Sequence, residues 1–308
     1  MLLGLRSRCT TPAPCATASA SSTSTISSTA RRAAILAAVV CVLTLTIAGP
    51  VRTYFAQRTE MKQLTATEAA LRDDPFVLND PMSRSLRAAV VARSRFVEDE
   101  LCRCVAAGVR QYVVLGAGLD TFAYRNPHGE AGLRVFEVDH AATQLWKQRL
   151  LAEARIRVPA SLTFVPMDFE RDDLAQALQQ AGFEAGQAAC ISWMGVTVYL
   201  SADAVSRTLT TVAGFAAGSS LCFDYRVAAT MLEPIERVVL ETLERHSAAV
   251  GEPWLSAFDP TQLQGQLLEL GFGCAQTATS QDLNARYFAR RKDGLCTGGG
   301  VRLMCATK

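Results

Sequence analysis

Apolar runs of strand length alternate with longer segments of helical period from residue 60 onward. The predicted strands are 111–115, 133–138, 161–165, 188–193, 219–225, 273–278 and 301–306. The predicted helices are 60–72, 84–107, 141–155, 170–181, 201–216, 228–249 and 260–270. Because the strands are almost continuously hydrophobic and alternate with helices, they favour a parallel sheet covered on both faces. The pattern predicts an α/β, Rossmann-like fold with about seven strands, mostly parallel.

Small and acidic residues follow three of these strands directly. The first strand leads into Gly116 and Gly118, the second into Asp139, and the third is followed by Asp168. Glycines at such a turn let the backbone bend sharply, and they let a ligand lie against it. Ligands of open α/β sheets lie beyond the carboxyl ends of the strands, so these residues predict a binding site at that edge.

The same residues discriminate between nucleotide ligands. A dinucleotide fingerprint needs a third glycine at position 121, which is Thr121 here, and Asp120 would place a carboxylate near the pyrophosphate. A ligand with an ammonium and a sulfonium tolerates acids, and S-adenosyl-L-methionine is such a ligand. Asp139 can then accept from the ribose hydroxyls and Asp168 from the adenine amine. Glu137 points to the same side of its strand as Asp139, so which of the two holds the ribose stays open.

Four segments in this order and at this spacing closely resemble the leucine carboxyl methyltransferase family, particularly its bacterial-type O-methyltransferase branch. They read GAGLDTFAYR, FEVDHAATQLWK, FVPMDFERDDL and GVTVYLSADAV. The resemblance covers roughly residues 64–306. It implies a class I methyltransferase fold with helical lid elements and S-adenosyl-L-methionine as the cofactor. It also implies an enzyme that methylates an oxygen.

The resemblance also implies cofactor-binding residues. Arg93 is expected to bind the methionine carboxylate of the cofactor, and Gly116 to approach it. Asp139 is expected to bind the ribose. Asp168 and the Phe169 backbone are expected to bind the adenine. Independently, Arg93 lies on an otherwise apolar helical stripe, where its guanidinium needs an anion.

One position departs from the family pattern. The family usually has an acid just before the G-V-x-x-Y-L run, and this chain has Met194 there. A thioether cannot accept from an ammonium as a carboxylate does, and losing one charged hydrogen bond would weaken binding by ~1.5–3 kcal/mol. A catalytically weak or inactive cofactor-binding relative is therefore one alternative. An NAD(P)-dependent oxidoreductase is the other, which the glycine pattern disfavours.

The methyl acceptor is expected to be a small molecule with a carboxylate or a hydroxyl. A carboxylate acceptor needs no base, and no catalytic residue is assigned. A hydroxyl acceptor would need one, for which the candidate imidazoles are His128, His140 and His246. Residues at or just after the fourth and fifth strands could line the acceptor pocket: Tyr199, Asp224 and Tyr225.

The N-terminal segment differs from the rest of the chain. Residues 1–30 form a Ser/Thr-rich lead that is predicted to be disordered, and residues 31–52 form a hydrophobic helix. The apolar stretch 33–51 is just long enough to span a bilayer as a single membrane anchor. A cleaved organelle-targeting peptide and a buried helix of a cytoplasmic catalytic domain are the alternatives. Residues 60–308 form the predicted methyltransferase domain.

Charge and cysteine content exclude some partners. Residues 1–59 hold six Arg and no acid, so the rest of the chain carries a net charge of about −4. The rest of the sequence also has no cluster of basic residues that could follow a phosphate backbone, which argues against nucleic acid as a partner. The ten cysteines include no C-x-x-C pair and fall partly in apolar runs, which is typical of reduced, buried thiols. No metal site is predicted, and the oligomeric state is left open.

Overall fold

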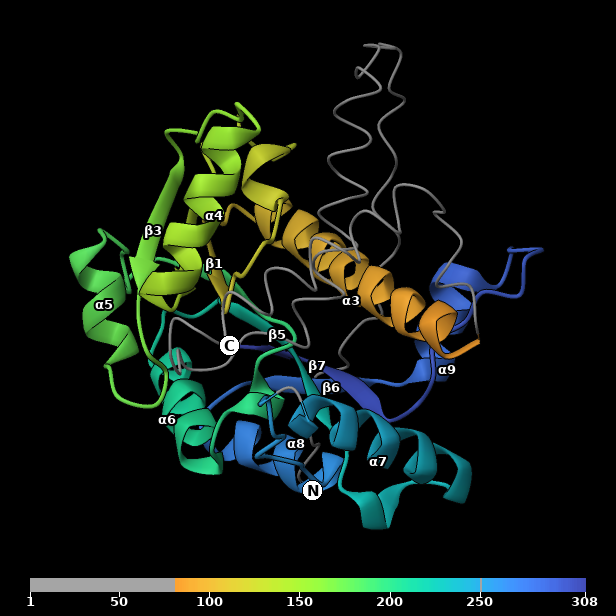
Figure 1. The fold of residues 1–308 in the computed structure, drawn as a ribbon. Coiled ribbons are helices and arrows are strands. Elements are labelled where there is room, and N and C mark those ends of the chain that lie inside the picture. Colours follow the sequence, from red (N-terminus) through yellow and green to blue (C-terminus); the bar gives the residue numbers. More distant parts are fainter. Residues whose placement is uncertain (1–80, 250) are drawn as a thin grey trace, which may run out of the picture.

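The computed structural model describes residues 81–249 and 251–308 (Figure 1). The predicted helix 60–72, the Ser/Thr-rich lead and the apolar stretch 33–51 lie outside these residues. In the described part, no helix is both long enough and apolar enough to cross a membrane. The predicted membrane anchor therefore stays a prediction.

Seven strands form one sheet in the order β3-β2-β1-β4-β5-β7-β6. Strand β7 runs antiparallel to both of its neighbours, and the other strand pairs are parallel. The predicted mostly parallel, Rossmann-like sheet is confirmed, and each predicted strand boundary lies within one residue of the observed one. The strands are β1 (Gln111–Leu115), β2 (Arg134–Asp139), β3 (Leu162–Pro166), β4 (Ala189–Trp193), β5 (Ser220–Arg226), β6 (Cys274–Ala278) and β7 (Val301–Thr307).

The helices follow the predicted order with local differences. Helix α5 begins later than predicted because the Asp173 carboxylate caps it by accepting from the Gln176 N–H. The predicted segment 228–249 contains a short 3₁₀ turn, Ala229–Met231, before helix α7 starts. The α-helices are α3 (Pro81–Ala106), α4 (Ala141–Glu153), α5 (Leu174–Gln180), α6 (Ala202–Ala213), α7 (Pro234–Ala249), α8 (Pro260–Glu269) and α9 (Ser280–Leu283).

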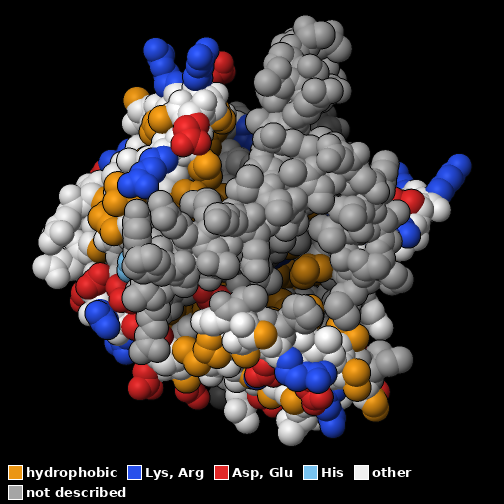
Figure 2. Space-filling view, in the orientation of Figure 1, with side chains coloured by type: hydrophobic (Ala, Val, Ile, Leu, Met, Phe, Trp, Pro, Cys, Tyr) orange, Lys and Arg blue, Asp and Glu red, His pale blue; other side chains and the backbone are white. Residues whose placement is uncertain are grey.

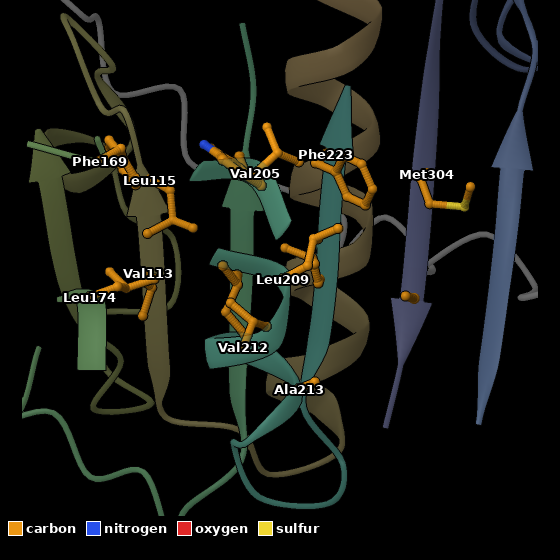
Figure 3. Packing of buried hydrophobic residues seen from close by; sticks show 14 of the residues in the cluster. Val113, Leu115, Phe169, Leu174, Val205, Leu209, Val212, Ala213, Phe223 and Met304 are labelled. Atoms are coloured by element: carbon orange, nitrogen blue, oxygen red, sulfur yellow. The ribbon is translucent and has the colours of Figure 1, made fainter. Parts of the chain in front are cut away.

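Side chains alternate between two hydrophobic clusters on opposite faces of the sheet. Val113 and Leu115 of β1 pack on the face covered by α5, α6 and α8, where α6 contributes Leu209 (Figure 3). Tyr112 and Val114 of the same strand pack on the other face, against α3. Figure 1 shows α3 crossing one side of the sheet as a single long helix. Because both faces are covered, the ends of the strands are where polar groups can meet a ligand.

Charged side chains of both signs are intermixed with apolar ones on the described surface shown in Figure 2. No basic stripe stands out among the described residues on that face. The prediction that nucleic acid is not a partner rests on the sequence alone and stays a prediction.

Candidate cofactor-binding site

The turn after β1 is joined by hydrogen bonds to the end of β2. Gly116 and Gly118 both have positive φ, 66° and 47°, which glycine adopts without strain. The Gly116 N–H donates to the Val138 carbonyl at 2.7 Å, and the Gly118 N–H donates to Asp139 Oδ2 at 2.5 Å. The other carboxylate oxygen, Asp139 Oδ1, accepts from the His140 N–H at 2.6 Å. These bonds fix the Asp139 carboxylate beside the glycine turn.

The two glycines differ in what surrounds them. A Cβ built on Gly116 would lie 2.1 Å from Cγ2 of Val196, in the loop after β4. A Cβ on Gly118 would meet no described atom within 4 Å. Among the described residues, Val196 therefore packs closely against Gly116, and no atom stands where a ligand would approach the backbone at Gly118.

Glu137 and Asp139 lie on the same side of β2 but in different surroundings. Glu137 is 1% exposed, and Lys147 Nζ of α4 donates to its Oε2 at 2.6 Å. Burial raises the pKa of Glu137 to about 7 despite this lysine, because desolvation disfavours the charged form. Burial also raises the pKa of Asp139, against the lowering effect of its two backbone donors. Glu137 is thus engaged in an interior ion pair, while Asp139 stands at the strand end.

The segment after β3 continues the same edge of the sheet. The Met167 N–H donates to the Asp139 carbonyl at 2.9 Å, which places Asp168 and Phe169 next to the end of β2. Asp168 Oδ1 accepts from the Glu170 N–H at 3.0 Å, so its carboxylate shapes its own turn. The Phe169 ring is buried and stacks on the Trp193 ring, with 6.2 Å between centroids. Gly116, Asp139 and Asp168 are therefore brought together at the ends of three adjacent strands.

Comparisons with known proteins identify the family to which this chain is similar. The leucine carboxyl methyltransferase family model matches residues 30–213, which includes the apolar run 33–49. YktD of Bacillus subtilis is 32% identical over 240 residues, 77% of this chain and 79% of its own. FRAAL3718 of Frankia alni is 35% identical over 201 residues, 65% of this chain and 66% of its own. The names of both describe inferred S-adenosyl-L-methionine-dependent methyltransferases.

The chain belongs to the leucine carboxyl methyltransferase family. It is an S-adenosyl-L-methionine-dependent methyltransferase, as the sequence predicts. A crystal structure of an inferred methyltransferase from Thermobifida fusca matches with a TM-score of 0.54 at 20% identity. That match covers 87% of this chain and 93% of the other, and at this identity it supports the fold alone.

The arginine that the sequence predicts for the cofactor pairs with an internal carboxylate. Arg93 lies on α3, and its Nη1 donates to Asp224 Oδ2 at 2.9 Å. Asp224 Oδ1 accepts from the Gly195 N–H at 2.7 Å. The sequence places Asp224 with the acceptor pocket and does not pair it with Arg93. A signal was present, because an acid inside the apolar run SSLCFDY needs a partner once buried.

Met194 follows the end of β4 and packs among apolar side chains. It is half-buried and contacts the cluster beneath α3 and a second cluster formed with α9 and the π-helical turn Asn284–Phe288. That turn was missed by the sequence analysis because it is too short to show a period. Met194 thus contributes apolar packing after the end of β4.

The candidate bases have other roles or surroundings. His140 caps α4, where its Nδ1 accepts from the Ala142 N–H at 3.3 Å. Burial lowers the pKa of His128, which lies in the connection between β1 and β2. The side chain of His246 lies outside the described residues. Tyr199 is a candidate for the acceptor pocket, and burial raises its pKa, so its phenol holds its proton more tightly. None of these observations assigns a catalytic base, and the catalytic residue stays unassigned.

The described cysteines are mostly free thiols. Cys104, Cys190, Cys222, Cys296 and Cys305 form no disulfide, whereas Cys274 is disulfide-bonded and departs from the prediction. Glu100, Cys222 and Cys305 lie close enough together to be considered as metal ligands. However, Glu100 already pairs with Arg103 and accepts from Ser220 Oγ at 2.6 Å, and burial raises the pKa of Cys222. A metal needs thiolates, so these groups give no reason to place one there.

Proposed function

We propose that this methyltransferase transfers the methyl group of S-adenosyl-L-methionine to a carboxylate or hydroxyl oxygen of a small molecule. The observation that supports it best is the junction of the glycine turn with Asp139, where a backbone N–H and a carboxylate are fixed beside open space. Asp120, two residues after Gly118, would repel a pyrophosphate, whereas the Asp139 carboxylate can bind a ribose diol.

Each binding residue has a proposed partner on the cofactor. Asp139 would accept from the ribose hydroxyls, because Glu137 is engaged by Lys147. Asp168 would accept from the adenine amine, with the Phe169 backbone beside it. Arg93 would bind the methionine carboxylate with donors that Asp224 leaves available.

The cofactor, when bound, supplies an electrophilic methyl group on a positively charged sulfur. The work left to the chain is to align the acceptor oxygen with that carbon and to exclude water. Orientation of this kind contributes ~7–11 kcal/mol to a two-substrate reaction. A carboxylate acceptor is already ionised at neutral pH and needs no base.

The binding part of the proposal is tested by calorimetry with S-adenosylhomocysteine and NADH. We expect binding of S-adenosylhomocysteine and none of NADH. Binding of NADH but not of S-adenosylhomocysteine would instead favour an NAD(P)-dependent oxidoreductase. The acceptor is tested with labelled S-adenosyl-L-methionine and small molecules that copurify with the protein. A methyl ester releases methanol in alkali and a methyl ether does not, so the product identifies the oxygen that was methylated.

A weak or inactive relative is the second candidate, because Met194 stands where the family usually has an acid. The Met194→Glu variant tests this alternative. If the natural protein binds S-adenosylhomocysteine poorly and the variant binds it well, the natural chain is not a working catalyst. If the natural protein and the Met194→Glu variant bind S-adenosylhomocysteine similarly, Met194 gives no reason to regard the chain as an inactive relative.

A further inference from the structure

Asp224 lies near the carboxyl end of β5, two residues before its last residue, on the side of the sheet that faces α3. It follows Cys222 by two residues, and Cys222 packs in the cluster beneath α3. The last residue pair of β4 and β5 is Trp193 with Phe223, so the next residues along the two strands are Met194 and Asp224. The end of β5 therefore carries a carboxylate where the end of β4 carries a thioether. Asp224 is 3% exposed.

The described residues occupy only about half of the hydrogen-bond acceptor sites of the Asp224 carboxylate. Oδ2 accepts from Arg93 and Oδ1 accepts from the Gly195 N–H. A carboxylate has about four acceptor sites, so about two remain. Arg93 is similar, since a guanidinium has five N–H donors and this one makes a single ion pair with the described residues. Its side chain is 17% exposed.

Asp224 also connects the pair to the glycine turn. Its bond to the Gly195 N–H fixes the start of the loop after β4, and its carbonyl accepts from Thr197 Oγ1 at 2.7 Å. Val196, between these two anchored residues, is the side chain that packs against Gly116. The ion pair and the glycine turn therefore border the same region.

A neutral pair of opposite charges matches one group in particular. The amino-acid end of S-adenosyl-L-methionine is a zwitterion, with a carboxylate and an ammonium on one carbon. We propose that Arg93 and Asp224 together bind this zwitterion, with the guanidinium on the carboxylate and Asp224 on the ammonium. Asp224 is then the acid for the ammonium that the end of β4 does not supply. This inference rests on the proposed function.

The test compares three ligands: S-adenosylhomocysteine, its analogue without the amino group, and its analogue without the carboxylate. Affinities are measured by calorimetry for the natural protein, Asp224→Asn and Arg93→Gln. Asn at 224 can still accept from the Gly195 N–H but carries no charge. The control is Asp99→Asn, which removes an acid that pairs with Arg95 and Arg286 elsewhere on α3.

We expect Asp224→Asn to weaken binding of S-adenosylhomocysteine by about 10- to 100-fold, the value of one charged hydrogen bond. The same variant should leave the affinity for the analogue without the amino group nearly unchanged. Arg93→Gln should show the converse pattern, with nearly unchanged affinity for the analogue without the carboxylate. Asp99→Asn should bind all three ligands as the natural protein does.

Equal losses for S-adenosylhomocysteine and the amino-free analogue in Asp224→Asn would overturn the inference, because Asp224 would then act only through the fold. If that variant does not fold, the natural protein decides. Equal affinity for these two ligands overturns the inference, and a loss of about tenfold or more without the amino group supports a charged acceptor for the ammonium, which Asp224 is placed to supply. No binding of S-adenosylhomocysteine at all would refute the proposed function itself.

Discussion

The Gly116→Ala substitution tests whether the turn after β1 depends on close packing against the loop after β4. The added Cβ would lie 2.1 Å from Cγ2 of Val196, far inside van der Waals contact. Val196 is β-branched and cannot swing away by a terminal rotation alone. The φ of 66° at this position is also unfavourable for alanine.

Two costs add in this variant. The left-handed backbone conformation costs about 1–2 kcal/mol for a residue with a Cβ. Overpacking against Val196 costs about a further 1–3 kcal/mol. The free energy of unfolding should therefore fall by about 2–5 kcal/mol. Because Val196 must move, the affinity for S-adenosylhomocysteine should fall as well.

Gly182→Ala is the matched control for backbone strain. Gly182 has a φ of 84°, and a Cβ there would meet no described atom within 4 Å, so only the strain applies. Urea unfolding of Gly116→Ala, Val196→Ala, the double variant and Gly182→Ala gives the free energies. The double variant should lose less stability than the two single variants together. Additive losses, or equal losses for Gly116→Ala and Gly182→Ala, would refute the packing argument.

Three further predictions follow from the site. Asp139→Asn should weaken S-adenosylhomocysteine binding at least about tenfold by calorimetry, because a charged acceptor is lost; unchanged affinity would exclude Asp139 from the ribose. If adenine lies against Phe169, binding should change the fluorescence of Trp193, on which that ring stacks, and Phe169→Ala should abolish the change. The natural protein should lose stability as the pH rises from about 4.5 to 7, because burial raises the pKa of Glu137 to about 7 and the native state holds a proton that the unfolded chain releases. In Lys147→Met, which removes the lysine that lowers this pKa, the decline should extend above pH 7 in urea unfolding, and an unchanged pH profile would contradict this.

The sheet was predictable because the local sequence shows which segments are buried. Strands covered on both faces read as continuous apolar runs, and all seven appeared within one residue of their observed boundaries. Helix ends were less certain, since the start of α5 depends on a single capping carboxylate at Asp173. The turn Asn284–Phe288 is too short for any period to be visible.

The sequence by itself determined the fold class, the family and the residues that meet at the ends of β1, β2 and β3, because strand order along the chain and short motifs carry that information. Only the tertiary structure separated Glu137 from Asp139, since both point the same way along β2 and the difference is made by Lys147 from α4. It also decided that Arg93 pairs with Asp224, 131 residues away. Contacts between distant segments depend on how helices pack across the sheet, and no local pattern of hydrophobic and polar residues records that packing.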